Sequence, residues 1–283
     1  VSMNIAIIGL GLIGGSIARC LKKNTPHTVL GMDIDPQVIY KARLLDAIDN
    51  ELTDERLGIC DMVILATWPR AAVEYVQTHA DLLKPGAMVM DVCGVKQAVC
   101  QPLWALAQEK GFRFVGGHPM AGIEYSGFSH SKADLFQNAS MILVPPKGMD
   151  IQTVANLKHF WHELGFARVV ITTAENHDRM IAYTSQLAHI LSSAYVQSPT
   201  ALEHFGFSAG SFKDLSRVAR LNEDMWTELF FENQGPLLHE VDTLIDNLTR
   251  YRNALRDGDT QAMHDLLKEG RIRKAAADSK EDQ

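Results

Sequence analysis

The chain has 283 residues, of which 46% are hydrophobic and 22% are charged. This length suits one large domain or two of ordinary size, and the composition is typical of a globular protein, not a disordered or fibrous one. The 27 basic and 34 acidic residues give a net charge of −7, which argues against nucleic acid as a partner. The longest apolar runs have the length of strands, so no membrane span is expected.

The cysteines and the N-terminal segment indicate where the protein works. No C-x-x-C pair occurs, and the spacing with histidine does not match a metal site, so we expect reduced thiols and no bound metal. The segment MNIAIIGLGLIGGS begins directly with a strand and a turn, without the features of a signal peptide. A cytoplasmic protein is therefore expected. The four cysteines are Cys20, Cys60, Cys93 and Cys100.

The first 173 residues alternate between apolar runs of strand length and segments with helical periodicity. Continuous apolar runs are typical of strands that are covered on both faces, so the pattern predicts an α/β fold with a parallel, doubly wound Rossmann-type sheet. The predicted strands are 4–8, 28–32, 61–67, 87–93, 112–117, 140–146 and 167–173, and the predicted helices run to about 23 and over 70–83, 97–111 and 150–165.

From residue 174 onward the pattern is helical. The sequence Thr172-x-x-Glu175 resembles a capping box that opens a helix to about residue 197. Further helices are predicted over 211–233, 236–256 and 260–275. We therefore expect a dinucleotide-binding domain over 1–173 and a helical domain over 174–283 for substrate binding and dimerisation. The apolar stripe of one long helix could pack within the helical part or on a second copy of the chain, and we favour a homodimer.

A glycine-rich turn after the first strand predicts a dinucleotide site. Gly9-x-Gly11-x-x-Gly14, with Leu12 and Ile13 between the last two glycines, follows a strand and opens a helix. The first two glycines permit a tight turn and the approach of a pyrophosphate, and the third lets the helix pack on the strand.

Asp33 ends the second predicted strand and decides between the cofactors. A carboxylate there accepts hydrogen bonds from the ribose of NAD and repels the 2′-phosphate of NADP, so NAD is expected. Asp33 could instead cap the helix that Pro36 enters, although Asp35 can also supply that cap.

The segment ATWPRAAV follows another central strand and carries Thr67 and Pro69. Ligands of open α/β sheets bind at the carboxyl ends of the strands, so we expect this loop to cover the adenosine or the phosphates. Alternatively, the segment is only the start of a helix with proline at its first position.

His118 lies between glycine-rich turns just after the predicted strand 112–117. A nicotinamide bound at the glycine loop would extend to this edge of the sheet, and a histidine there can take the proton from an alcohol as hydride leaves. By residue type alone a structural histidine is the commoner case, but the position favours a catalytic one.

At this point a resemblance becomes specific. The blocks IAIIGLGLIGGS, MDVCGVK, GGHPMAGIEYSG, LFQNASMILVPP and SFKDLSRVAR, in this order over nearly the whole chain, resemble the prephenate dehydrogenase family of tyrosine biosynthesis. The resemblance implies oxidation of prephenate to 4-hydroxyphenylpyruvate, or of arogenate to tyrosine, with hydride transfer to NAD or NADP and loss of carbon dioxide. It does not separate prephenate from arogenate.

The resemblance also implies roles for individual residues. His118 matches the catalytic histidine, and Glu124 an acid at the substrate entrance, with a solvated carboxylate as the alternative. Asp178, Ala182, Ser185, His189 and Ser192 share one helical stripe that could form a substrate wall. Lys213, Arg217 and Arg220 have the spacing of one helix face, on which a carboxylate could bind or which could be solvated. The substrate-binding residues implied are Ser185, His189, Gly210, Lys213, Arg217 and Glu124.

One departure from the family pattern lies beside the expected nicotinamide. The family usually has serine before Val-Lys in the block that reads MDVCGVK here, and this chain has Gly94. The serine hydroxyl is absent, so we expect slower hydride transfer or a rearranged proton network. Water or Cys93 could substitute in part.

Two other functions compete with this one. Another Rossmann-type β-hydroxyacid or imine dehydrogenase would place a catalytic lysine on the first helix after the sheet, and NHDRMIAYTSQLAHI has none. A noncatalytic nucleotide sensor has only the Gly94 departure in its favour.

Overall fold

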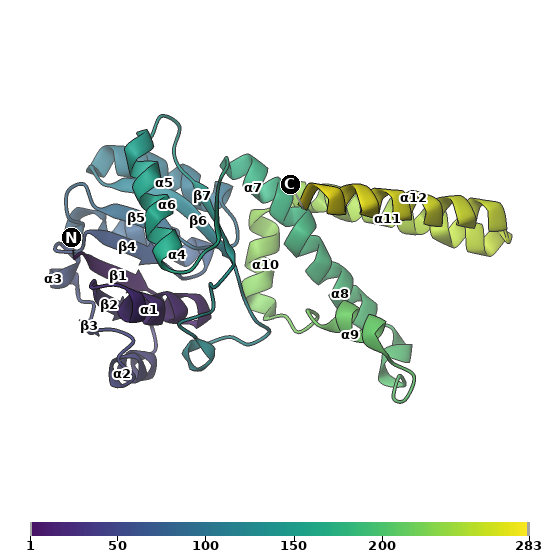
Figure 1. Cartoon of the computed structure of the whole chain (residues 1–283), viewed down its shortest axis with the longest axis horizontal. Coiled ribbons are helices and arrows are strands. Elements are labelled where there is room, and N and C mark those ends of the chain that lie inside the picture. The colour runs from purple at the N-terminus through teal and green to yellow at the C-terminus, as the bar shows by residue number, and fades with distance from the viewer. Residues whose placement is uncertain (1, 282–283) are drawn as a thin grey trace. The chain divides into compact units, whose positions relative to one another are not determined.

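The computed structural model describes residues 2–281, and over this range the strands form one eight-stranded sheet in the order β3-β2-β1-β4-β5-β6-β7-β8 (Figure 1). All neighbouring strands are parallel except β6 and β7. The central strands are buried throughout because helices cover both faces. The strands are β1 (Asn4–Ile8), β2 (Thr28–Met32), β3 (Asn50–Glu51), β4 (Met62–Leu65), β5 (Met88–Asp91), β6 (Arg113–Met120), β7 (Ser140–Val144) and β8 (Arg168–Ile171).

Local signals start and stop the helices of the sheet region. Asp35 caps α2 by accepting from the backbone N–H of Gln37, and Asp150 caps α6 through Thr153. Gly111 ends α5 in the left-handed conformation that favours glycine. These helices are α1 (Leu12–Asn24), α2 (Pro36–Leu44), α3 (Asp54–Leu57), α4 (Pro69–His79), α5 (Gln97–Lys110) and α6 (Ile151–Glu163).

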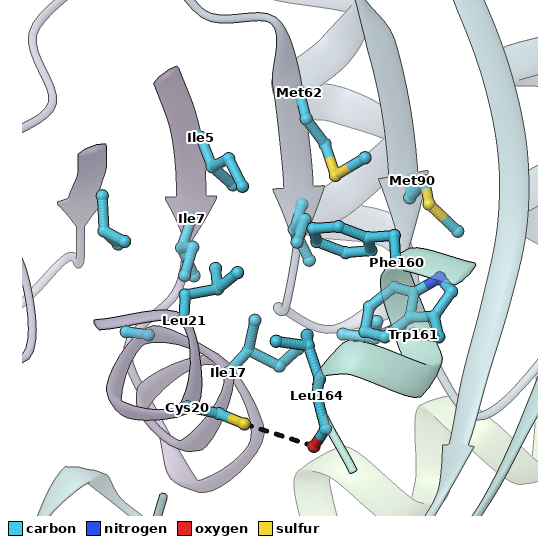
Figure 2. Close-up of a cluster of buried hydrophobic side chains, with 14 of the residues drawn as sticks. Ile5, Ile7, Ile17, Cys20, Leu21, Met62, Met90, Phe160, Trp161 and Leu164 are labelled. Atoms are coloured by element: carbon cyan, nitrogen blue, oxygen red, sulfur yellow. Dashed lines mark hydrogen bonds between the residues drawn. The ribbon is translucent and has the colours of Figure 1, made fainter. Parts of the chain in front are cut away.

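The core has one layer on each face of the sheet. Figure 2 shows side chains of α1 and α6 gathered against β1, β4 and β5, with Trp161 fully buried. The thiol of Cys20 donates to the carbonyl of Leu164 at 3.2 Å and ties these two helices together. The other layer is formed by α3, α4 and α5. Each fully buried aliphatic side chain contributes about 1.5–3 kcal/mol.

The strand that carries His118 is longer than its apolar run predicts. β6 continues to Met120, and its last five residues pair with the antiparallel β7, with His118 opposite Ile142. The parallel partner β5 pairs with β6 only as far as Val115. His118 therefore lies within a strand and not after one, and the sheet is mixed at this point.

The helical segment after β8 begins with a single long helix. Its N-cap is Thr173, which accepts from the backbone N–H of Asn176 at 3.2 Å, so the expected cap at Thr172 was wrong by one residue. The segment runs through α7 (Ala174–Ile181), a π-helical turn (Ala182–Leu187) and α8 (Ala188–Val196). The π turn shifts the helical register by a fraction of a turn.

The helix expected over 211–233 is broken in two. α9 (Gly210–Ser216) and α10 (Glu223–Glu232) are separate because Asn222 starts a new helix by accepting from the backbone N–H of Met225. This cap competes with continuation of the first helix.

By contacts, the chain divides into two compact units between Gln234 and Gly235. The second unit is a helical hairpin of α11 (Gln234–Asp257) and α12 (Thr260–Glu281), joined by an ion pair between Arg250 and Glu269 at 3.0 Å (Figure 1). The boundary expected at 173/174 is one of sequence pattern and stays a prediction. Within residues 2–281 no helix is both long and apolar enough to cross a bilayer.

Candidate active site

The glycine loop between β1 and α1 has the geometry that a pyrophosphate needs. Gly9 has φ of +89°, and a Cβ there would lie 2.6 Å from the carbonyl oxygen of Ala66. A Cβ on Gly14 would lie 1.9 Å from the carbonyl oxygen of Gly9, whereas one on Gly11 would meet nothing within 4 Å. The space beside Gly11 and the uncapped N-terminus of α1, which includes Leu12 and Ile13, fit a bound dinucleotide.

Asp33 stands at the end of β2, half-buried beside this loop. Its carboxylate accepts from the backbone N–H of Leu10 at 2.8 Å and of Asp35 at 3.0 Å. These bonds fix the carboxylate and leave lone pairs for two ribose hydroxyls. Asp35, and not Asp33, caps the next helix. The residues present therefore fit the adenosine ribose of NAD.

Thr67 and Pro69 lie at the same edge, after β4. The Thr67 Cγ2 atom is 2.8 Å from the position that a Cβ on Gly9 would take, so Thr67 adjoins the glycine loop. Pro69 is the first residue of α4, as the alternative of a helix start with proline at its first position requires. The thiol of Cys93 donates to the carbonyl of Thr67 at 3.3 Å. The Cys93 thiol is thus hydrogen-bonded to Thr67 and does not replace the missing serine hydroxyl.

His118 is held from one side only. Its Nδ1 lies 2.9 Å from Nε2 of His177, and no other described residue makes a hydrogen bond with its ring. Burial, together with nearby His177 and Lys96, lowers the pKa of His118 well below its usual value. At neutral pH the ring is therefore uncharged, as a general base must be.

His177 connects His118 to a buried carboxylate. Its Nδ1 lies 2.7 Å from Oδ1 of Asp178. Asp178 also accepts from the backbone N–H groups of Lys96 at 2.8 Å and Gln97 at 2.9 Å, which caps the start of α5 from α7. His177 was not predicted as a site residue from the sequence. The adjacent His-Asp pair in the first turns of a helix that follows the sheet was the available signal.

A buried ion pair fixes the backbone that carries His118. Asp91 and Lys96 are both fully buried and bonded to each other. Asp91 also accepts from the backbone N–H of Cys93 at 2.9 Å and of Gly117 at 3.3 Å. The end of β5 is thereby tied to the residue that precedes His118. Removing either partner would leave an unpaired buried charge, which is strongly destabilising.

The expected substrate wall is divided by the packing of its members. Asp178 faces α5, and the hydroxyl of Ser192 donates to the carbonyl of Leu215 at 2.6 Å, so these two residues are structural parts of the stripe. Ser185 and His189 remain half-buried. The Nδ1 of His189 lies 2.7 Å from the carbonyl of Ser185, and its ring packs on Trp226 with centroids 4.0 Å apart.

The three cations expected on one helix face do not all lie on a helix. α9 ends at Ser216, so Lys213 lies on the helix, Arg217 at its end and Arg220 in the link to α10. Arg217 forms an ion pair with Glu124 at 2.8 Å, which joins the segment after β6 to the end of α9. Gly210 begins α9, with open space where a Cβ would be.

The fold and the site together define a dehydrogenase of the Rossmann class: a sheet with a dinucleotide loop and an uncharged histidine at the edge where the cofactor binds. Residues 17–171 match the sequence model of the prephenate dehydrogenase nucleotide-binding domain, and residues 173–269 match that of the prephenate dehydrogenase dimerization domain. The chain belongs to the prephenate dehydrogenase family. The cyclohexadienyl dehydrogenase of Zymomonas mobilis is 33% identical over 274 residues, which cover 92% of each chain.

Solved structures agree with this assignment. Prephenate dehydrogenase of Aquifex aeolicus, solved in complex with hydroxyphenyl propionate and NAD+, superposes with a TM-score of 0.84 at 28% identity and covers 98% of this chain and 99% of its own. Arogenate dehydrogenase of Synechocystis gives a TM-score of 0.80 at 26% identity, covering 97% and 100%.

Proposed function

We propose that the protein is an NAD-dependent prephenate dehydrogenase. The observation that carries the proposal is the placement of His118: an uncharged imidazole at the cofactor edge of the sheet, bonded through Nδ1 and without a described partner at Nε2. Family membership adds the reaction, and Asp33 and the glycine loop add the cofactor.

The reaction removes two electrons from the substrate ring. When bound, NAD accepts a hydride from the ring carbon that bears the hydroxyl group. His118 takes the hydroxyl proton at Nε2, so the carbon becomes a ketone. The bond to the ring carboxylate then breaks, carbon dioxide leaves, and its electron pair makes the ring aromatic. The ketone oxygen becomes a phenolate and regains the proton, which leaves 4-hydroxyphenylpyruvate and a neutral His118.

The substrate has two carboxylates, and we propose that cations of the α9 segment hold them. Arg217 offers a planar fork for a carboxylate, and Lys213 lies one helical turn before it. Glu124 occupies the Arg217 guanidinium at 2.8 Å, so a substrate carboxylate would compete with Glu124 for it. His189, supported by Ser185 and Trp226, and Gly210 complete the proposed substrate pocket.

Arogenate is the second candidate substrate. It differs from prephenate only in carrying an amino group where prephenate has a keto group. The proposed pocket holds both an acid, Glu124, and a cation, Arg217. A structural relative is named arogenate dehydrogenase.

We also propose that the protein works as a homodimer in the cytoplasm. The match of residues 173–269 to a dimerization domain supports the dimer. All four cysteines are buried free thiols, which suits a reducing compartment.

The decisive assay combines the purified protein with NAD and prephenate and follows the absorbance of reduced nicotinamide and the release of 4-hydroxyphenylpyruvate. We expect the two products in equal amounts, with NADP a poorer cofactor. Turnover of arogenate but not prephenate would select the second candidate. A folded protein inactive with both substrates and both cofactors would contradict the dehydrogenase assignment.

A further inference from the structure

Three side chains from two distant parts of the sequence form one row: the half-buried His118 on β6, and the buried His177 and Asp178 on α7. The row runs from Nδ1 of His118 to Nε2 of His177 at 2.9 Å, and from Nδ1 of His177 to Oδ1 of Asp178 at 2.7 Å. His177 and Asp178 are 1% and 0% exposed. The proposed reaction requires no contact of His177 or Asp178 with the substrate or the cofactor.

The hydrogen bonds of Asp178 determine where the protons lie along this row. Asp178 receives two backbone N–H groups at the start of α5, and those groups can only donate, so the carboxylate is an acceptor throughout. The facing Nδ1 of His177 must then carry a proton. Burial lowers the pKa of His177, so its ring is neutral at pH 7 and its Nε2 holds a lone pair.

A lone pair on Nε2 of His177 fixes His118 in turn. Two lone pairs 2.9 Å apart would repel, so Nδ1 of His118 donates its proton to His177. A neutral imidazole carries one such proton, which leaves Nε2 of His118 unprotonated. This is the atom that the proposed reaction uses as the proton acceptor.

We propose that His177 and Asp178 are positioning residues that hold His118 in the tautomer with a free Nε2. The proposal rests on the proposed function for the part played by His118. When His118 takes the substrate proton, its stronger Nδ1–H bond and the carboxylate of Asp178 stabilise the cation.

The surroundings of the row are fixed as well. On one side the ion pair of Asp91 and Lys96 lies between β5 and α5. From α10, the amide of Asn233 donates to the backbone carbonyl of Asp178 at 2.8 Å and to Oε1 of Gln186 at 2.7 Å. The charged groups that set the titration of His118 and His177 are therefore Asp91, Lys96 and Asp178.

The first test reads the tautomer directly. Nitrogen-15 NMR of the histidine side chains, assigned with His118→Asn, should find His118 protonated at Nδ1 in the free protein. His118 protonated at Nε2 would overturn the proposal whether or not the protein is active. In His177→Phe, which keeps the ring volume but has no acceptor, the Nε2-protonated form should gain population.

The second test separates positioning from folding. We expect His177→Phe to lower kcat with prephenate by about 10- to 100-fold, with KM values changed by less than about threefold. His177→Gln should recover most of kcat, because its amide oxygen accepts the same proton. In the background of His118→Asn, His177→Phe should not lower kcat any further, because His177 acts through His118. His162→Phe, at an exposed histidine on α6 whose Nδ1 lies 2.8 Å from the backbone carbonyl of Phe166, is the control variant and should match the wild type.

The outcomes separate the two proposals. No turnover by the wild type would contradict the proposed function and leave the NMR result to decide the tautomer. Turnover that His177→Phe leaves unchanged, or a folded His177→Gln as slow as His177→Phe, would overturn the positioning role alone. If His177→Phe does not fold, the wild-type tautomer and the His177→Gln rate still decide.

Discussion

At the scale of single residues, Gly94 is the position where this chain departs from its family. A Cβ there would lie 3.3 Å from Cδ2 of Leu229, a contact that a small shift of the leucine side chain relieves. Cys93 is bonded to Thr67 and does not supply the missing hydroxyl. The chain thus has one hydroxyl group fewer than the family pattern at this position.

Gly94→Ser should restore that group. We expect kcat to rise severalfold and the free energy of unfolding to fall by about 1 kcal/mol because of the contact with Leu229. Steady-state kinetics and thermal unfolding check this. A sharp fall of kcat with unchanged folding would contradict the view that the absent hydroxyl limits the enzyme.

Asp33 should determine cofactor choice. Asp33→Ser removes charge-assisted hydrogen bonds worth about 1.5–3 kcal/mol, so kcat/KM for NAD should fall by about 10- to 100-fold while that for NADP rises. Asp35→Ser is the matched control. It alters the cap of α2 and should leave the ratio of NAD to NADP unchanged.

The buried histidines should make stability depend on pH. A histidine titrates near 6.5 in the unfolded chain, and burial lowers the pKa values of His118 and His177 in the folded protein. Between the lowered values and 6.5 the unfolded chain binds more protons, so stability is complete above about pH 6.5 and is lost as pH falls. Thermal unfolding from about pH 8 to 5 should show this loss, and His177→Gln should reduce it. A melting temperature that stays constant or rises on acidification would contradict this.

At the scale of elements, the apolar runs predicted most strands because burial on two faces leaves a clear sequence pattern. Helical periodicity predicted both long C-terminal helices. The direction of β7 was not predictable in this way, since an apolar run looks alike in parallel and antiparallel pairs. The π turn and the cap at Asn222 were not predicted either, because each depends on which of several competing local hydrogen bonds forms. The row from His118 to Asp178 depends on contacts between residues far apart in sequence, which periodicity does not report.

The cap at Asn222 should hold α10 in place over the site. Asn222→Ala should lower the free energy of unfolding by about 1 kcal/mol, or about 2 °C in Tm. It should also raise KM for the substrate, because α10 carries Trp226. Asn222→Asp keeps an acceptor and should retain wild-type stability. An alanine variant as stable as the wild type would mean that tertiary packing alone sets this helix start.

At the scale of the whole molecule, the second unit leaves an apolar stripe exposed along α11. Leu238, Ile245 and Leu248 are each more than half exposed and recur at helical spacing. If the proposed dimer covers this stripe, Ile245→Asp with Leu248→Asp should produce monomers in sedimentation experiments, while the wild type sediments as a dimer. Asp246→Lys with Asn247→Lys, between the same positions, should leave the dimer intact.

The role of His118 as the proton acceptor is central to the proposed reaction, and one comparison of variants tests it directly. The kcat of His118→Asn with prephenate and NAD should be about 10²- to 10⁴-fold below that of the wild type, with the Kd for NAD unchanged. A variant that binds NAD normally and keeps a kcat close to the wild-type value would contradict the assignment.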